Sequence, residues 1–294
     1  MGSAAGFLNG ERTLLPSLLL CDRHGLGGDD LARRLPPSSS SGGGWQRGGR
    51  SRKSSKHVEE DVLQRFIDST YKHGTATTIE EVSAMILGLI FAGNHTSATT
   101  STWTGACLLS HENFLNAALE EQKRKGRKYN DKIDYCILLE MSTLHNFIKE
   151  VARMHPAVPM LVRQVKTDII VRGKEGNEYG IPKGNILVNL VMVNGMLPHI
   201  YKDPAVFDPD RFCPGREEDK AGGKFSYTSF GDGRHACCGE AYAYMQIKII
   251  FNHILRNFEL KLISSFPKPD WIKFMPESKG AVMVSYKRFQ WPSN

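Results

Sequence analysis

F-G-D-G-R-H-A-C-C-G, at residues 230–239, is the most informative segment of the chain. Its glycines predict a loosely constrained loop, and the residues after Gly239 have the apolar spacing of an amphipathic helix. The loop therefore brings Cys237 to a helix N-terminus, where free backbone N–H groups and the helix dipole favour an anionic thiolate. The chain has six cysteines but no C-x-x-C pair that would favour another metal site. We expect Cys237 to bind an electron-poor group.

The segment matches the pattern F-x-x-G-x-[RH]-x-C-x-G, and in this the chain resembles the cytochrome P-450 superfamily. The resemblance implies that Cys237 is the axial thiolate ligand of haem b, iron protoporphyrin IX. It also implies that Phe230 packs beneath the porphyrin near the sulfur and that Gly239 adjoins the cofactor. Arg163 and His235 are then expected to pair with the haem propionates.

Two charged residues upstream, Glu150 and Arg153, are three positions apart in a helix-like run, which places both on one helix face. Alone, such a pair is typical of a solvated surface salt bridge. The resemblance implies instead a buried network with Arg211, from the segment D-P-D-R-F at residues 208–212. Bidentate guanidinium geometry suits such a network. We expect it to hold the haem-side core together rather than to do chemistry.

Residues 77–81, T-T-I-E-E, are typical of a capping box, and an apolar stretch with helical spacing follows them. We expect one long helix over residues 79–111. Its apolar run at residues 84–93 is too short to span a bilayer, so we expect it to be buried in the core. The helix carries A-G-N-H-T at residues 92–96. The resemblance implies that it crosses the distal face of the haem, where Thr96 and His95 relay protons to dioxygen.

A narrower resemblance is to sterol 14-alpha-demethylases, in particular the plant type that acts on obtusifoliol-like sterols. In that branch a histidine stands at the position of His95, where many other monooxygenases have an acid. Matching segments occur at residues 91–97, 101–105, 181–184, 197–200, 208–219, 246–248 and 255–259. The resemblance implies a haem-thiolate monooxygenase that removes the 14-alpha-methyl group of a sterol such as obtusifoliol.

Four residues depart from that branch. Pro159 stands where an aliphatic series lining the substrate cavity is expected, Asn94 replaces a glutamine, and Cys238 replaces an aliphatic residue. Asp232 replaces a glycine and belongs to the few residue types that tolerate a positive φ. Two alternatives therefore stay open. One is a relative recruited to hydroxylate or epoxidise another sterol or triterpenoid, and the other is a truncated, catalytically inactive fragment.

The first 57 residues differ from the rest in composition. They hold nine Lys and Arg against four Asp and Glu, and eleven of the 28 glycines. We expect a low-complexity, disordered tail at residues 1–57 and a haem-binding segment at residues 58–294 that resembles the C-terminal half of the family. Full-length eukaryotic relatives are tethered to the endoplasmic reticulum membrane, and this sequence shows no evident anchor. The arginine-glycine run is short, so we expect no nucleic acid partner.

The sequence contains no segment that resembles a flavin or nicotinamide site. The resemblance therefore implies that electrons come from NADPH through a separate NADPH-cytochrome P-450 reductase, with O₂ and a sterol or triterpenoid as substrates. Lys220, Lys224, Arg234 and Lys248 lie near the cysteine loop in the sequence. They form either a surface for an acidic partner or scattered surface charge.

The periodicity of the remaining chain predicts a mainly α fold with a small β-sheet, as in the C-terminal half of the cytochrome P-450 fold. Helices are expected at residues 115–128, 134–154 and 239–257. Strands are expected at residues 161–165, 169–172, 186–193 and 282–286.

Overall fold

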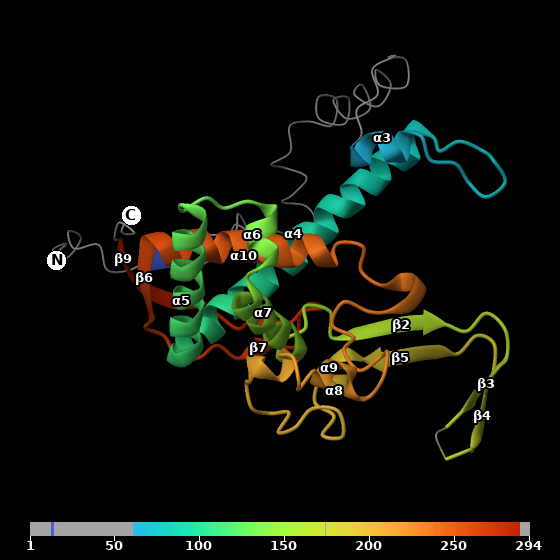
Figure 1. Cartoon of the computed structure of the whole chain (residues 1–294). Helices are drawn as coiled ribbons and strands as arrows, with labels where there is room; N and C mark the ends of the chain where they lie inside the picture. Colours follow the sequence, from blue (N-terminus) through green and yellow to red (C-terminus); the bar gives the residue numbers. More distant parts are fainter. Residues whose placement is uncertain (1–12, 15–60, 174, 289–294) are drawn as a thin grey trace, which may run out of the picture. The chain divides into compact units, whose positions relative to one another are not determined.

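The computed structural model describes residues 13–14, 61–173 and 175–288 (Figure 1). The chain divides into two compact units, one of residues 20–95 and one of residues 1–19 and 96–294. The proposed tail at residues 1–57 lies outside the described residues, apart from Thr13 and Leu14.

The unit of residues 20–95 contains helix α3 (Val62–Ile67) and the first half of helix α4 (Ile79–Ser110). A reciprocal capping box begins α4. The backbone N–H of Glu81 donates to Thr78 Oγ1 at 3.2 Å, and Glu81 Oε2 accepts from the backbone N–H of Thr78 at 2.8 Å. These two bonds satisfy backbone donors that a helix start leaves unpaired. The prediction of one long helix near residues 79–111 is confirmed.

The apolar first half of α4 is exposed rather than buried. Phe91 is 72% exposed, and Leu87 and Ile90 are also open to solvent. The expectation of a core helix at residues 84–93 is therefore wrong for this chain. The described part of its unit offers only the six-residue helix α3 to pack against α4, too little surface to cover these side chains.

The larger unit is built around four helices, α5 (Glu112–Tyr129), α6 (Tyr135–Leu139), α7 (Ser142–Met154) and α10 (Glu240–Asn257). The single helix predicted over residues 134–154 is in fact two, α6 and α7. The break has a tertiary cause. Glu121 of α5 accepts hydrogen bonds from the backbone N–H groups of Thr143 at 2.9 Å and Leu144 at 3.2 Å. A carboxylate from another helix thus caps the start of α7 and stabilises a new helix N-terminus there.

The hydrophobic core of this unit forms where α5, α6, α7 and α10 meet the last turns of α4. Trp103 of α4, Phe147 and Val151 of α7, and Ile247 and Phe251 of α10 are among its buried members. Because α7 is buried along most of its length, it is the central element of the unit (Figure 1).

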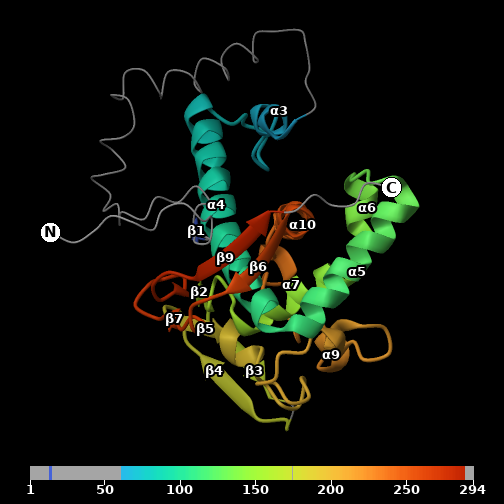
Figure 2. The same ribbon diagram turned by 90° about the vertical axis from the view of Figure 1, so that its left-hand side faces the viewer.

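The strands form small antiparallel sheets. Strand β2 (Met160–Gln164) pairs with β5 (Ile186–Leu190), β3 (Ile169–Arg172) with β4 (Glu178–Ile181), and β7 (Pro269–Asp270) with β8 (Glu277–Ser278). Strand β9 (Met283–Arg288) lies between β6 (Phe258–Leu262) and β1 (Thr13–Leu14). The pair β6–β9 and the pair β2–β5 lie on opposite sides of the unit (Figures 1 and 2). The strand predicted at residues 186–193 is shorter, because helix α8 (Val191–Asn194) follows β5.

Short helical elements complete the unit: η2 (Pro209–Phe212), α9 (Glu218–Ala221) and η3 (Gly233–His235). The prediction of a mainly α fold with little β-structure is confirmed. In the described part of the chain, no helix combines the length and the apolar character needed to cross a membrane.

Two histidines at α7 are held neutral by their surroundings. The ring of His155 stacks on Trp103, with centroids 4.1 Å apart and planes at 4°. Burial lowers the pKa of His155 to about 4, and nearby Arg153 adds to the effect. Burial also lowers the pKa of His145 to about 4, together with the positive charges of Lys248 and Lys149.

These two histidines predict a pH-dependent stability. Between about pH 6.5 and pH 4 the unfolded chain binds protons at His145 and His155 that the folded chain does not, so the free energy of unfolding falls as the pH falls. Each histidine contributes a slope of up to about 1.4 kcal/mol per pH unit. His145→Gln and His155→Gln should each flatten urea-unfolding stability plotted against pH. The exposed His253→Gln is the control, and equal slopes in all three variants would contradict the prediction.

Candidate functional site

The cysteine loop is closed by backbone hydrogen bonds just before α10. The N–H of Cys237 donates to the carbonyl oxygen of Phe230 at 2.8 Å, and Gly231 N–H donates to Thr228 O at 2.9 Å. Gly231 has φ +72°, and a Cβ added there would lie 3.4 Å from the carbonyl oxygen of His235. Only glycine adopts this conformation without strain. The loop therefore returns on itself and presents Cys237 shortly before the helix begins at Glu240.

The sulfur of Cys237 is available to a ligand. Cys237 and its neighbour Cys238 are both exposed free thiols. A Cβ added at Gly239 would meet only the Cys237 sulfur, at 3.8 Å, so the missing side chain leaves space beside the sulfur. Across the described residues, no three His, Cys, Asp or Glu side chains gather as a metal-binding group. The protein donor at this site is thus a single exposed cysteine sulfur, which suits a metal whose other ligands come from a cofactor.

The first strand of the β2–β5 pair passes beside the cysteine loop. The Cδ1 of Leu161 lies 3.9 Å from where a Gly231 Cβ would be. Arg163 is two residues further along β2 and so projects from the same face as Leu161. Arg163 is exposed and donates to the neighbouring Val162 carbonyl at 2.8 Å, and His235 is exposed in η3. Within the described residues, neither of these side chains forms an ion pair with a carboxylate.

The two residues expected to relay protons lie next to each other on α4. Thr96 and His95 are both partly buried, and the boundary between the two units falls between them. Helix α4 continues through this point without interruption.

The four residues that depart from the sterol-demethylase pattern lie in three parts of the structure: the cysteine loop, the segment before β2, and α4. Asp232 has φ −160°, so the expected use of a positive φ is wrong, and its flanking glycines adopt that conformation instead. Its side chain accepts a hydrogen bond from Gly233 N–H. Pro159 is buried directly before β2. Asn94 is exposed on α4, and Cys238 is exposed beside Cys237.

Glu150, Arg153 and Arg211 meet in one fully buried ion network. Arg153 donates to both carboxylate oxygens of Glu150, from Nε and Nη2 at 2.7 Å each, and Arg211 Nε donates to Glu150 Oε1 at 3.0 Å. All three side chains have 0% exposure. The remaining donors of Arg153 reach the carbonyls of Gly195 at 2.5 Å and Pro204 at 2.8 Å. The network thus joins α7 to η2 and to the chain that precedes η2.

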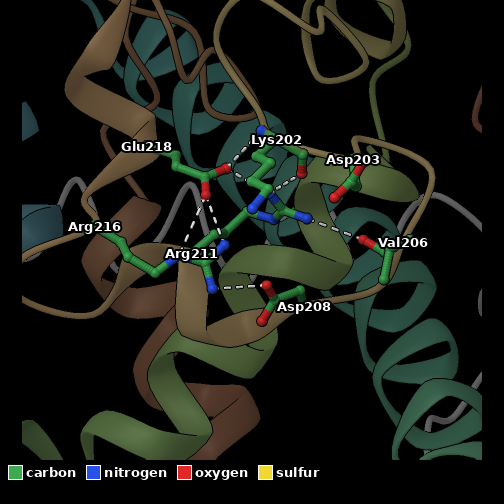
Figure 3. A pocket seen from close by; sticks show the side chains of 7 residues that line it. All are labelled: Lys202, Asp203, Val206, Asp208, Arg211, Arg216 and Glu218. Atoms are coloured by element: carbon green, nitrogen blue, oxygen red, sulfur yellow. Dashed lines mark hydrogen bonds and ion pairs between the residues drawn. The ribbon is translucent and has the colours of Figure 1, made fainter.

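The network continues outward through residues that the sequence patterns did not identify. Arg211 Nη1 pairs with Glu218 at 2.5 Å, Glu218 with Arg216 at 2.6 Å, and Arg216 with Asp208 at 2.8 Å. These side chains line a pocket of about 570 Å³ (Figure 3). Burial opposes ionisation of Glu218, but hydrogen bonds from Arg216, the Lys202 backbone and Arg211 hold its pKa below the usual value. Because three cations face three carboxylates, the chain of charges is balanced.

Tyr201 completes the buried side of the network. The guanidinium carbons of Arg153 and Arg211 lie 5.2 Å and 5.9 Å from its ring centre, within cation–π range. Its hydroxyl donates to the carbonyl of Ser226 at 3.0 Å, and burial raises its pKa. No local sequence signal marks Tyr201, since its role depends on two arginines distant in the chain.

The four basic residues expected near the loop do not form one surface. Lys248 is buried, and its Nζ donates to the carbonyl of Leu138 at 2.8 Å. Its pKa is lowered to about 8 by burial, partly offset by Glu121. Lys220 pairs with Glu217. Lys248 faces α6 because it lies on the inner side of α10, so of the two alternatives the shared four-residue basic surface is excluded.

Most of the chain matches the model of one protein family. The family model described as Cytochrome P450 matches residues 46–289. The chain therefore belongs to the cytochrome P450 family, and the resemblance noted from its motifs is confirmed.

Among named relatives, the chain is 54% identical to "Obtusifoliol 14-alpha demethylase" of Sorghum bicolor over 81% of its own length and 49% of the relative. It is 52% identical to "Sterol 14-demethylase" of Arabidopsis thaliana over 82% of its length and 49% of the relative. It is 34% identical to "Lanosterol 14-alpha demethylase" of Homo sapiens over 81% of its length and 45% of the relative. The chain thus spans about half the length of the curated relatives it matches.

Solved structures show the same fold. The haem domain of cytochrome P450DA superposes with a TM-score of 0.72 at 21% identity, over 86% of this chain and 54% of that one. A retinoic acid-bound cyanobacterial CYP120A1 gives a TM-score of 0.72 at 22% identity, over 83% and 54%.

The ion network leads to a prediction for stability. Glu150→Gln leaves the two arginines buried without their shared anion, which should lower the free energy of unfolding by about 3–5 kcal/mol. Glu120→Gln is the matched control, because Glu120 also pairs with a cation three residues on, Lys123, but at an exposed position. That substitution should have little effect. Urea unfolding of the full chain measures both, and similar losses would show that burial does not matter.

Proposed function

We propose that this chain forms the haem-binding part of a sterol 14-alpha-demethylase, with Cys237 as the axial ligand of haem b. The observation that carries the proposal is the exposed free thiol of Cys237 on a loop closed against Phe230, within a chain of the cytochrome P450 family. The sterol substrate is supported by the similarity to the sterol demethylases of sorghum and Arabidopsis.

The residues present fit a haem. Cys237 would hold the iron, and Phe230 would pack against the sulfur side of the ring. Arg163 and His235 would hold the propionates, since both are exposed and neither has a carboxylate partner among the described residues. The backbone of His235 lies beside Gly231, and Arg163 is two residues along β2 from Leu161, which also lies beside Gly231. The space beside Gly239 would admit the edge of the porphyrin.

The bound haem would use O₂ and electrons from NADPH, delivered by NADPH-cytochrome P-450 reductase, to insert oxygen into the substrate. The chain's own part would be to keep Cys237 anionic, to hold the loop still, and to move protons. Thr96 would hold a proton on its hydroxyl oxygen, and His95 would exchange protons at its imidazole. The Glu150 network would keep α7 and the η2 segment fixed behind the site.

An apolar face supports a lipid-like substrate. Along β2 and β5, the cross-strand pairs Met160–Leu190 and Val162–Val188 lie on one face of the ribbon and are exposed. This face is opposite the one that carries Leu161 and Arg163. Ile272 and Phe274 after β7 are also exposed, at 93% and 76%. Apolar side chains that are open in this chain would cover a sterol only when further polypeptide closes over them.

The ligand assignment makes a spectroscopic prediction. The reduced, haem-loaded chain under carbon monoxide should show the red-shifted Soret band of thiolate ligation, because only a thiolate donates enough electron density to the iron. Cys237→Ser should abolish that band. Cys238→Ser is the matched control, an adjacent exposed thiol that should leave the band in place. The red-shifted band persisting in Cys237→Ser would remove the basis of the proposal.

The substrate assignment is tested by reconstitution with reductase, NADPH and obtusifoliol. The isolated chain should give no demethylation and should release peroxide, because reacting atoms must be held about 3–3.5 Å apart and an open site cannot do so. Joining the N-terminal half of the sorghum relative ahead of residue 58 should restore 14-demethylation, with Thr96→Ala forming less product per NADPH.

The product of the joined protein distinguishes the alternatives. Hydroxylated or epoxidised sterol that keeps its 14-methyl group would instead favour a recruited oxygenase, to which the buried Pro159 before β2 lends support. No oxygenated product at all would favour an inactive fragment. Efficient demethylation by the isolated chain would overturn the expectation that the site is incomplete.

A further inference from the structure

One buried aromatic residue of α10 touches both the cysteine loop and α7. The ring of Tyr244 lies between Phe230, with centroids 5.2 Å apart, and His145 of α7, at 4.4 Å. Tyr244 is only 7% exposed. Its His145 neighbour is neutral near pH 7, because its pKa is lowered to about 4 by burial and by Lys248 and Lys149. Both ring contacts of Tyr244 are therefore packing contacts between uncharged rings.

The Tyr244 hydroxyl takes part in a directed hydrogen-bond chain. Tyr227 donates its single hydroxyl hydrogen to the carbonyl oxygen of Lys149 at 3.1 Å, because a carbonyl can only accept. The Tyr227 and Tyr244 oxygens are 3.2 Å apart. The hydrogen between them must then come from Tyr244. The chain runs from Tyr244 through Tyr227 to α7, one residue before Glu150.

Phe230 links Tyr244 to the segment that carries Cys237. Its side chain contacts Tyr244, while its backbone carbonyl accepts the Cys237 N–H at 2.8 Å. A shift of Phe230 would therefore also move the backbone carbonyl to which the Cys237 N–H is bonded. The sulfur itself is exposed, and no other aromatic ring contact of Phe230 occurs in the described residues. Tyr244 is thus the aromatic support of the loop.

We propose that Tyr244 is a positioning residue for the Cys237 thiolate: its ring holds Phe230, and its hydroxyl, through Tyr227, fixes α10 to α7 beside the Glu150 network. This inference rests on the proposed haem ligation by Cys237. Its effect would be to keep the thiolate on the iron rather than to take part in the reaction.

The ring is tested with the haem-loaded full chain under carbon monoxide. Two carbon monoxide complexes are compared: the thiolate-bound complex, in which Cys237 is on the iron, and the thiolate-lost complex, in which it has dissociated. Tyr244→Leu should lower the ratio of the first to the second by about two- to tenfold, as expected for the loss of one aromatic pair. Phe251→Leu is the matched control. Phe251 is also a buried ring of α10, on the same face about 10 Å further along the helix, and it belongs to the helical core. It should lower the melting temperature but leave the ratio unchanged.

The hydroxyl chain is tested with variants that keep both rings. Tyr227→Phe should speed the conversion of thiolate-bound to thiolate-lost complex by about two- to tenfold, as expected for a lost hydrogen bond. Tyr244→Phe should also speed it, but should add nothing in the Tyr227→Phe background, because its partner is then already absent. This measurement holds even if Tyr244→Leu does not fold.

Several outcomes would overturn the inference. For the ring, these outcomes are an unchanged thiolate-bound to thiolate-lost ratio in Tyr244→Leu, or the same change of that ratio in Tyr244→Leu and Phe251→Leu. For the hydroxyl chain, they are an unchanged conversion rate in Tyr227→Phe, or additive effects of the two Tyr→Phe changes on that rate. Cys237→Ser separates this inference from the function on which it rests. If that variant keeps the red-shifted band, the haem ligation itself is wrong. If it loses the band while the tyrosine variants behave as wild type, only the role of Tyr244 fails.

Discussion

The buried carboxylate of Glu150 is the interaction on which the rest of this structure depends. Two arginines with no exposure to solvent point at it, and each would be an uncompensated charge without it. The remaining donors of these arginines bind carbonyls of the segments around η2, so one anion determines where three segments of chain lie. The net stabilisation from such a network is smaller than its Coulomb attraction, because desolvation of the charges offsets much of that attraction.

The cysteine loop depends on that arrangement indirectly. Helix α7 carries Glu150, and the same helix contacts Tyr244 and Tyr227, which in turn support Phe230. The chemically reactive atom is therefore exposed, while the residues that place it are buried. This division is physically reasonable, since a ligand needs access to the sulfur and the loop needs a rigid base. One face of the β2–β5 pair is also apolar and open to solvent, and the chain spans about half of its relatives' length.

Sequence patterns correctly predicted the family, the long helix α4 and the pairing of Glu150 with Arg153. Each of these predictions rests on residue spacing within a short segment. The patterns were wrong where another segment decides. The helix predicted over residues 134–154 is broken by Glu121, a carboxylate from α5. Of the two alternatives for the basic residues near the loop, a shared surface is excluded because Lys248 faces inward and donates to the carbonyl of Leu138. The apolar run of α4 is exposed because burial needs a partner surface, which periodicity does not supply.

The sequence by itself predicted a candidate ligand, Cys237, in a glycine-containing loop before a helix. It also placed the pair Glu150 and Arg153, and then Arg211, upstream of that loop in the family's order. Only the tertiary structure decided that Glu218, Arg216 and Asp208 extend the ion network, and that Tyr244 supports the loop through Phe230. The physical reason is distance along the chain. Local spacing sets helix faces and turns, whereas contacts between residues far apart in sequence depend on how the helices pack.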